Sequence, residues 1–202
     1  MALTQTQVCN LALGRVGAQS IMSIDDEDSK GARVCKNAYE ATVREVSRAG
    51  EWNCLKKRAT LARLTAAPAF EWEYQFQLPV DFISLTELNG VEYKDEPQDN
   101  WEIEGRLLLT DAESAQVRYI SYVEDTGIWD SLFTNAVVVL LASRIAVPIR
   151  QDEGMASALL SEYERVALPK ARMKDGNEQR KRRHDPCEGS RFLDARYFST
   201  NG

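Results

Sequence analysis

Residues 132–149 have the sequence LFTNAVVVLLASRIAVPI and are mostly apolar. Four residues interrupt the stretch: Asn135, Ser143, Arg144 and Pro148. A membrane-spanning helix needs about 20 predominantly apolar residues, so this stretch is too short and too polar to cross a bilayer. Its length and its content of Ala and Leu favour a helix over a strand. We therefore predict a helix that begins at Asp130 or Ser131, ends at Pro148 and is the most buried helix of the fold.

Upstream of this helix, the sequence predicts a block of short antiparallel strands. In the clearest strand, apolar residues alternate with Glu and Gln. This period of two places the polar residues on one face of the strand and the apolar ones on the other: Trp72, Tyr74, Phe76 and Leu78. The Asn89-Gly90 pair is typical of a two-residue hairpin turn. Further short strands are predicted at residues 101–103, 105–109 and 117–122, with turn signals between them.

Two helices are predicted before the strands. The first begins at Thr4, which opens a capping-box pattern, and it stops near Gly14 and Gly17. The second begins at Ser29 and has the clearest amphipathic pattern in the chain. Gly50 follows its last apolar residue, the position where a glycine commonly ends a helix.

A fourth helix is predicted to begin at Asp152, and Pro169 is expected to kink or end it. One side of this helix carries its apolar residues: Met155, Leu159, Tyr163 and Val166. Together the elements predict an α+β fold. It has three parts: a four-helix bundle-like body (1–50 and 130–175), an antiparallel β domain inserted between helices two and three (51–129), and an extended C-terminal arm (176–202).

The composition is that of a folded protein with unevenly distributed charge. Hydrophobic residues make up 44% and charged residues 28% of the 202 residues, which excludes wholesale disorder. The net charge of −6 argues against a generally basic nucleic-acid coat. Residues 71–130 contain fifteen acidic and three basic residues, whereas residues 170–202 contain nine basic and five acidic ones. This asymmetry indicates surfaces for different partners or, more simply, acidic strand faces that keep the protein soluble.

No catalytic, cofactor-binding or metal-binding residue is predicted. The one histidine, His184, lies in a polar basic tail near Cys187, where nothing in the sequence would hold it as a base. The four cysteines have no CxxC spacing, which argues against a structural zinc site. The acidic run at residues 25–28 could bind a hard cation, but it lacks EF-hand spacing, and a solvated loop that caps a helix is the favoured interpretation. No phosphate-binding glycine motif occurs.

The C-terminal tail has two features that indicate a partner. A basic run could contact nucleic-acid phosphates or an acidic protein: Arg180, Lys181, Arg182 and Arg183. Beyond it, aromatic and apolar residues are combined with arginine, the residue types that dominate interface hot spots: Arg191, Phe192, Leu193, Arg196, Tyr197 and Phe198. A solvated linker that ends in these residues is typical of a docking arm, and a frayed terminus is the alternative.

Short segments along almost the whole chain follow the order of motifs in a known family: residues 10–17 (NLALGRVG), Trp52, 72–81 (WEYQFQLPVD), 104–108 (EGRLL), 117–120 (VRYI), 130–133 (DSLF), 141–146 (LASRIA) and 192–196 (FLDAR). The Leu-Pro-x-Asp element at residues 78–81, which follows an aromatic strand, is the most specific of them. In these segments the chain resembles the head-to-tail adaptors of short-tailed phages, the tail tubular protein A-like family, including its prophage relatives.

The resemblance implies a structural virion protein and not an enzyme. Such adaptors form a ring, usually of twelve copies, beneath the portal protein, and the tail nozzle protein attaches below. DNA passes through the bore without sequence-specific contact, and no membrane is involved. The arm would then grip the portal, with Arg191 and Arg196 pairing with portal carboxylates and with Phe192 and Leu193 in apolar pockets between portal subunits.

The expected location follows from the same features. The N-terminus carries no secretory signal, and the thiols are most simply interpreted as reduced, which predicts a cytoplasmic setting. For an adaptor this means the host cytoplasm during assembly and the neck of the virion afterwards. Two other function classes stay open from the sequence: a carboxylate-dependent hydrolase and a DNA-binding module of a phage or prophage.

Overall fold

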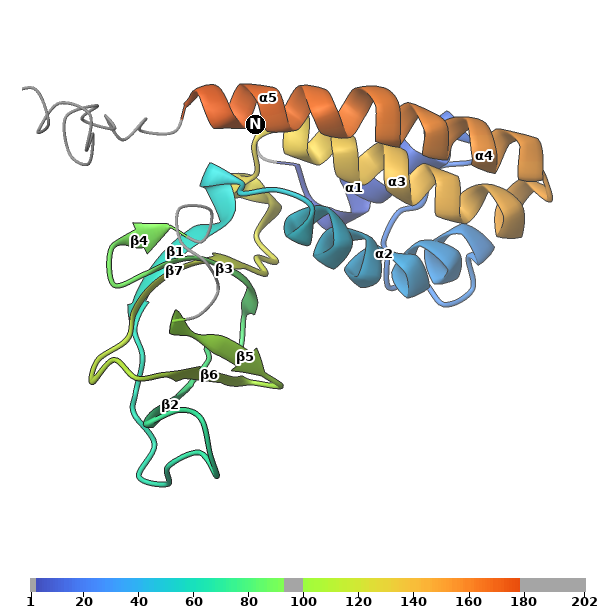
Figure 1. Ribbon diagram of the computed structural model, residues 1–202. Coiled ribbons are helices and arrows are strands. Elements are labelled where there is room, and N and C mark those ends of the chain that lie inside the picture. Colours follow the sequence, from blue (N-terminus) through green and yellow to red (C-terminus); the bar gives the residue numbers. More distant parts are fainter. Residues whose placement is uncertain (1–2, 93–99, 179–202) are drawn as a thin grey trace, which may run out of the picture.

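In the computed structural model, residues 3–92 and 100–178 are described. Their helices form one layer, and two small antiparallel sheets lie below one end of it (Figure 1). Along the chain, two helices come first, then the described strands, then the remaining helices. The α+β class predicted from the sequence is therefore confirmed.

The helical part of the described chain has these bounds: α1 Gln5–Arg15, α2 Lys30–Arg48, α3 Ser131–Arg150, α4 Glu153–Glu162, the π-helical turn η4 Tyr163–Ala167 and α5 Leu168–Asn177. α4, η4 and α5 follow one another without a break and form one rod (Figure 1). The predicted N-caps of α1, α2, α3 and α4 are confirmed. They are Thr4 with its capping box, Ser29, Asp130 and Asp152, whose side chains accept backbone N–H groups that have no partner within the helix.

α3 lies at the centre of the helical layer and packs against α1, α2, α4 and α5. The valines at 137–139 are helical, and residues 136–143 are all buried. By length and composition, α3 is the one helix in the described ranges that could cross a membrane, but 67% of its most apolar window is buried inside the protein. The prediction of a buried core helix is confirmed.

The predicted end of this helix at Pro148 is wrong. α3 continues to Arg150 and ends at Gln151, which has a φ of 56° and donates its N–H to the Val147 carbonyl. Proline removes one helical hydrogen bond and crowds the preceding turn. The last turn persists because Ile149, beyond the proline, still packs against the core around α3.

Gly50 follows Ala49, the C-cap of α2, as predicted. Its φ is not positive, so it does not end α2 in the left-handed conformation. A Cβ atom at this position would lie 2.8 Å from Cε2 of Trp52. The Trp52 indole is buried and donates its Nε1–H to the Val46 carbonyl at 2.7 Å. Glycine is needed here because the indole ring packs directly over the end of α2.

The π-helical turn overturns part of the prediction for the fourth helix. The Leu168 N–H donates to the Tyr163 carbonyl, five residues back, and the helix continues through Pro169 to Asn177. A π turn holds more residues than an α turn, so the face that points inward changes. Ala167 is therefore buried, whereas Val166, which we predicted on the apolar side, is exposed.

The described strands form two antiparallel sheets. The first has the order β1 (Lys56–Thr60), β7 (Gln116–Ser121), β3 (Phe82–Leu88), β4 (Val91–Glu92), and the second has the order β2 (Tyr74–Gln77), β6 (Leu107–Thr110), β5 (Glu102–Glu104). The predicted hairpin is confirmed, since Asn89 and Gly90 have φ values of 49° and 89° and join β3 to β4. Two short 3₁₀ segments connect the sheets to the helices: η1 (Asn53–Leu55) and η3 (Thr126–Ile128).

The two sheets enclose an apolar core of their own, separate from the core around α3. Its buried members come from both sheets and the loops beside them: Leu61, Phe76, Leu78, Leu85, Leu88, Leu108, Ala115, Val117 and Tyr119. The predicted aromatic face of β2 is correct for Phe76 and Leu78, which are buried. Trp72 and Tyr74 are only half-buried, and Trp72 precedes the strand rather than belonging to it.

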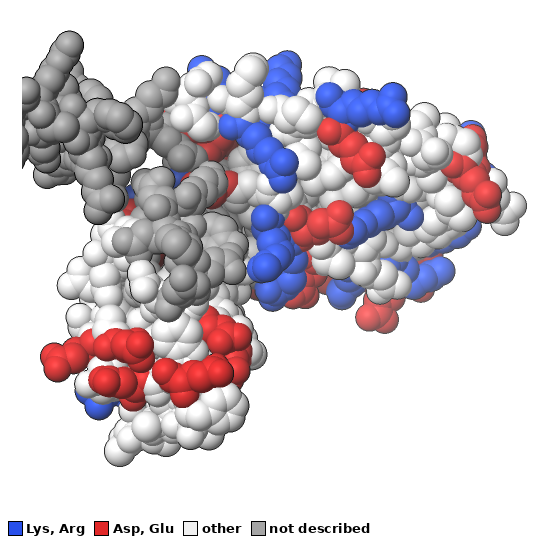
Figure 2. Space-filling view, in the orientation of Figure 1, with Lys and Arg blue, Asp and Glu red and all other residues white. Residues whose placement is uncertain are grey.

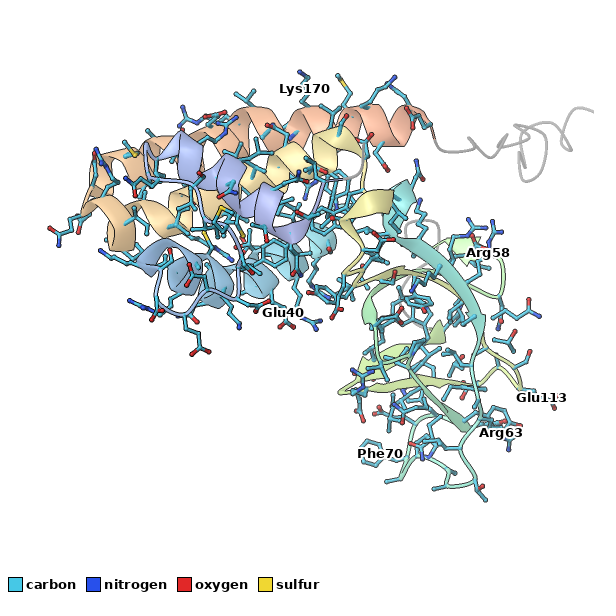
Figure 3. The ribbon with its side chains drawn as sticks, turned by 180° about the vertical axis from the view of Figure 1, so that it is seen from behind. Glu40, Arg58, Arg63, Phe70, Glu113 and Lys170 are labelled. Carbon is cyan, nitrogen blue, oxygen red and sulfur yellow. The ribbon has the colours of Figure 1, made fainter. Side chains whose placement is uncertain are left out.

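Replacing Phe76 with Ala tests this second core. Phe76 is 1% exposed, so the variant should lose about 3–5 kcal/mol of unfolding free energy. Urea denaturation followed by circular dichroism measures the loss. Phe70→Ala is the matched control, because Phe70 is 75% exposed and lies at the far end of the sheets (Figure 3). Equal stability of the two variants would show that the sheets do not depend on this core.

Candidate interaction surfaces

The residues that we predicted to bind partners lie outside the described part of the chain. This applies to the basic run 180–183, to the arm residues between Arg191 and Phe198, and to His184 and Cys187. The structure does define where the tail begins. Near the end of α5, Asp175 accepts the Asn53 N–H at 2.9 Å and the Asn53 side-chain amide at 3.0 Å. These bonds fix the end of α5 beside η1.

The acidic run at residues 25–28 lies just before α2. Asp25 pairs with Lys36 of α2 at 2.8 Å, and this hydrogen bond raises the pKa of the lysine. Asp26 accepts the N–H of Asp28 at 3.1 Å, a turn-type contact. In the described ranges, no group of three His, Cys, Asp or Glu side chains could hold a metal ion.

The described cysteines are packing residues. Cys9 of α1 and Cys35 of α2 are buried in the core around α3. A hydrogen bond between the two thiols and burial raise the pKa of Cys9, and burial raises the pKa of Cys54. Thiols with raised pKa values stay protonated at neutral pH and are poor nucleophiles.

An aromatic cluster joins the helices to the sheets. The Phe133 ring, in the first turn of α3, makes edge-to-face contacts with Trp52 at 5.2 Å and with Trp129 at 5.1 Å between ring centroids. Ile120 of β7 reaches the same core, and the Ser121 hydroxyl donates to the Leu55 carbonyl at 2.9 Å. Trp52 and the 130–133 motif, which are distant in sequence, therefore meet at this junction.

The Leu-Pro-x-Asp element connects β1 and β7 to the start of β3, which follows Asp81 directly. Asp81 accepts a hydrogen bond from Lys57 of β1 at 2.6 Å and one from the Tyr119 hydroxyl of β7 at 3.1 Å. Partial burial disfavours the charged Asp81 carboxylate, but these two donors outweigh it and keep its pKa below the usual value. Burial, together with the bond to Asp81, raises the pKa of Tyr119 to about 12.

The turn between β5 and β6 forms hydrogen bonds with Leu78 and Pro79, at the beginning of the same element. The Leu78 N–H donates to the Arg106 carbonyl at 3.0 Å, and the Arg106 guanidinium donates to the Pro79 carbonyl. The 72–81 and 104–108 motifs thus contact each other directly. Arg106 thereby holds the backbone of the Leu-Pro-x-Asp element.

An apolar cleft of 640 Å³ lies between α1, η3 and the first half of α3. Its walls are lined by Leu3, Leu11, Gly14, Arg15, Thr126, Gly127, Trp129, Ser131, Thr134, Asn135 and Val138. At one end, Arg15 pairs with Glu162 of α4 at 2.8 Å and reaches Asn135 at 3.5 Å. Leu11, on the wall, is 49% exposed.

Two features of this cleft are unexplained by contacts within the body. A Cβ atom at Gly14 would meet no atom within 4 Å, although a helical glycine costs about 0.5–1 kcal/mol relative to alanine. Trp129 is 8% exposed, and its buried Nε1–H has no hydrogen-bond acceptor. Sequence patterns did not indicate the cleft, because Leu11 and Gly14 lie in α1 while Trp129 is more than a hundred residues away. The available signal was Gly14, which we predicted near the end of the first helix and which lies inside α1.

A second cleft, of 610 Å³, opens between the two sheets and the end of α2. It is lined by Arg48, Trp72, Phe82, Ser84, Leu85, Trp101, Glu102 and Ile103. The Arg48 guanidinium donates to the Ile83 carbonyl at 2.9 Å, which closes the side toward the helices. Aromatic side chains and one carboxylate face this space, and none of its residues forms a nucleophile–base pair.

Charge is divided between the two parts of the molecule. On the face in Figure 2, Asp and Glu gather over the sheets, whereas Lys and Arg lie mostly over the helices. Basic residues also occur on the first sheet, in β1 and β7. Arg58 of β1 lies opposite Arg118 of β7, and its side chain points outward (Figure 3). Arg118 is neutralised by Glu87 at 2.8 Å. The predicted acidic character of the strand region is thus visible on the surface.

Compared with known protein families and with curated proteins, the chain matches no family model and no protein. Its interpretation therefore depends on the residues themselves and on the contacts that they make.

Replacing Asp81 with Asn tests the role of the Leu-Pro-x-Asp element. At neutral pH the variant should lose about 1–3 kcal/mol, because hydrogen bonds from Lys57 and Tyr119 to a charged acceptor are replaced by weaker ones. A carboxylate whose folded pKa is lowered stabilises the fold above its unfolded pKa of about 3.9, and this contribution disappears as the pH falls through the folded value.

Urea denaturation at a series of pH values measures both effects. The stabilities of the wild type and the variant should converge in acid. Glu113→Gln is the control, since Glu113 is an exposed carboxylate in the loop between β6 and β7. A variant as stable as the wild type at pH 7 would show that Asp81 does not hold the strands.

Proposed function

We propose that the protein is a structural adaptor of a short-tailed phage or prophage, which forms a ring between the portal and the tail nozzle. One observation carries this proposal. The motif residues that resemble the adaptor family make the contacts that hold the fold together, with Asp81 on Tyr119, Arg106 on Pro79, and Trp52 on Phe133. Motifs used in this way are those of a scaffold.

The rest of the proposal assigns the parts of the chain. The helices act as the four-helix bundle-like body of the adaptor, with the β domain at residues 51–129 inserted between α2 and α3. The arm assigned to residues 176–202 binds the portal, although its first two residues, Gly176 and Asn177, are still part of α5. The acidic surface of the sheets faces the bore, where like charge repels DNA phosphates and lets the duplex slide without sticking.

Assembly on a portal ring tests the proposal. The isolated protein is expected to be mostly monomeric at low concentration, because contacts between neighbours are weak until a scaffold raises their effective concentration. Light scattering after size-exclusion chromatography, with and without purified portal, should show the monomer alone and a ring on the portal. Electron microscopy then shows the ring directly. No portal binding, together with metal-dependent hydrolysis by the monomer, would favour the enzyme instead.

Deletion of residues 186–202 tests the arm. The truncated protein should still fold cooperatively, because the described core ends at α5. It should lose portal attachment, since the arginine and aromatic anchors are removed. Deletion of residues 199–202 alone leaves all six anchors and should bind normally. Full portal binding by the longer deletion would refute the docking arm.

A further inference from the structure

We infer that the cleft between α1, η3 and α3 is the binding site for the Arg191–Phe198 segment of this same chain, which is stored there when the protein is free. This goes beyond the proposed function, and it holds or fails without a portal. The argument starts from what the cleft lacks. Gly14 leaves open space beside Leu11 and Val138, and Leu11 on the wall is 49% exposed. An occupant with apolar side chains fills this space and covers Leu11.

The end of α5 places the tail beside this cleft. α3 and the α4–α5 rod run in opposite directions, so the end of α5 lies next to the start of α3 (Figure 1). Contacts confirm this position, because Asp175 binds Asn53. The residue before Asn53 is Trp52, which packs on Phe133, and Phe133 in turn packs on Trp129 of the cleft. The tail therefore starts within a few side chains of the cleft wall.

The tail is long enough to reach every part of the cleft. Thirteen residues lie between Glu178 and Phe192, and an extended chain covers roughly 3.3 Å per residue, or about 45 Å over the fourteen steps. The whole of α3 spans only about 30 Å at 1.5 Å per residue. The segment that arrives carries the apolar residues of the tail: Phe192, Leu193, Tyr197 and Phe198.

Charge also matches between the segment and the cleft. The polar end of the cleft presents Arg15 and Glu162 as a pair whose side chains are 32% and 41% exposed. The segment carries Asp194 directly after Leu193, with Arg191 and Arg196 on either side. When Phe192 and Leu193 lie in the apolar part of the cleft, Asp194 comes next to Arg15. Arg191 or Arg196 then lies next to Glu162. The ion pair that closes the cleft then becomes a four-charge network.

Site-specific photocrosslinking tests the inference in the full-length protein without a portal. Benzoylphenylalanine replaces Phe192, and after irradiation mass spectrometry maps the crosslinked peptide. Adducts on α1 and the first half of α3, at monomer mass and independent of protein concentration, are the expected result. Adducts elsewhere, or no adduct, would overturn the inference. Crosslinked dimers that increase with concentration would also overturn it and would identify a second copy as the occupant.

A variant whose cleft is filled by a larger side chain is compared with a control variant that leaves the cleft open. Gly14→Leu places a side chain in the open space and should reduce the adducts about tenfold or more, because one large apolar contact of the segment is lost. Gly176→Leu is the control, since Gly176 is also helical, its added Cβ meets nothing within 4 Å, and it lies outside the cleft. If Gly14→Leu does not fold, Leu11→Ser at the exposed wall replaces it. Unchanged adducts in a folded filled-cleft variant would refute the site. Portal binding is measured separately, so failure here leaves the adaptor proposal intact.

Discussion

Burial of α3 is the constraint on which the rest of the structure depends. Its sequence is apolar on nearly every side, so no single neighbour can cover it, and α1, α2, α4 and α5 all pack against it. Each large aliphatic side chain removed from water contributes about 1.5–3 kcal/mol, which makes this helix the main source of stability in the body. Its one charged residue before the last turn, Arg144, lies at the edge of the packing and bonds to Thr42 and Glu45 of α2.

The start of α3 also positions the sheets. Phe133 packs on Trp52 and Trp129, which lie at the two ends of the inserted β region, so the chain enters and leaves the sheets at one aromatic cluster. Arg48 adds a polar contact from α2 to the Ile83 carbonyl of β3. Two separate apolar cores are thereby connected through one aromatic cluster and one polar contact.

Several of the residues in the motifs that resemble the adaptor family form contacts within the fold. Asp81 bonds to Lys57 and Tyr119, Arg106 bonds to the Pro79 carbonyl, and Trp52 packs on Phe133, so each of the three has a structural role. The N-terminal motif differs from the others. Asn10 holds the Ile21 backbone through two hydrogen bonds, but Leu11 and Gly14 line a cleft that the body itself leaves unfilled. In this motif, Asn10 therefore stabilises the fold, whereas Leu11 and Gly14 form part of a surface that a binding segment can cover.

The sequence alone determined the local structure of this protein. The four helix starts, the buried character of α3 and the Asn89-Gly90 hairpin followed from short-range patterns, because capping, hydrophobic periodicity and turn geometry involve residues close in the chain. Tertiary structure decided what depends on distant partners. Packing carried α3 past Pro148, the Trp52 ring gave Gly50 its role, and the π turn exposed Val166. The cleft beside Gly14 likewise exists only because residues 3–15 and 126–138 meet in space, a contact that no local pattern encodes.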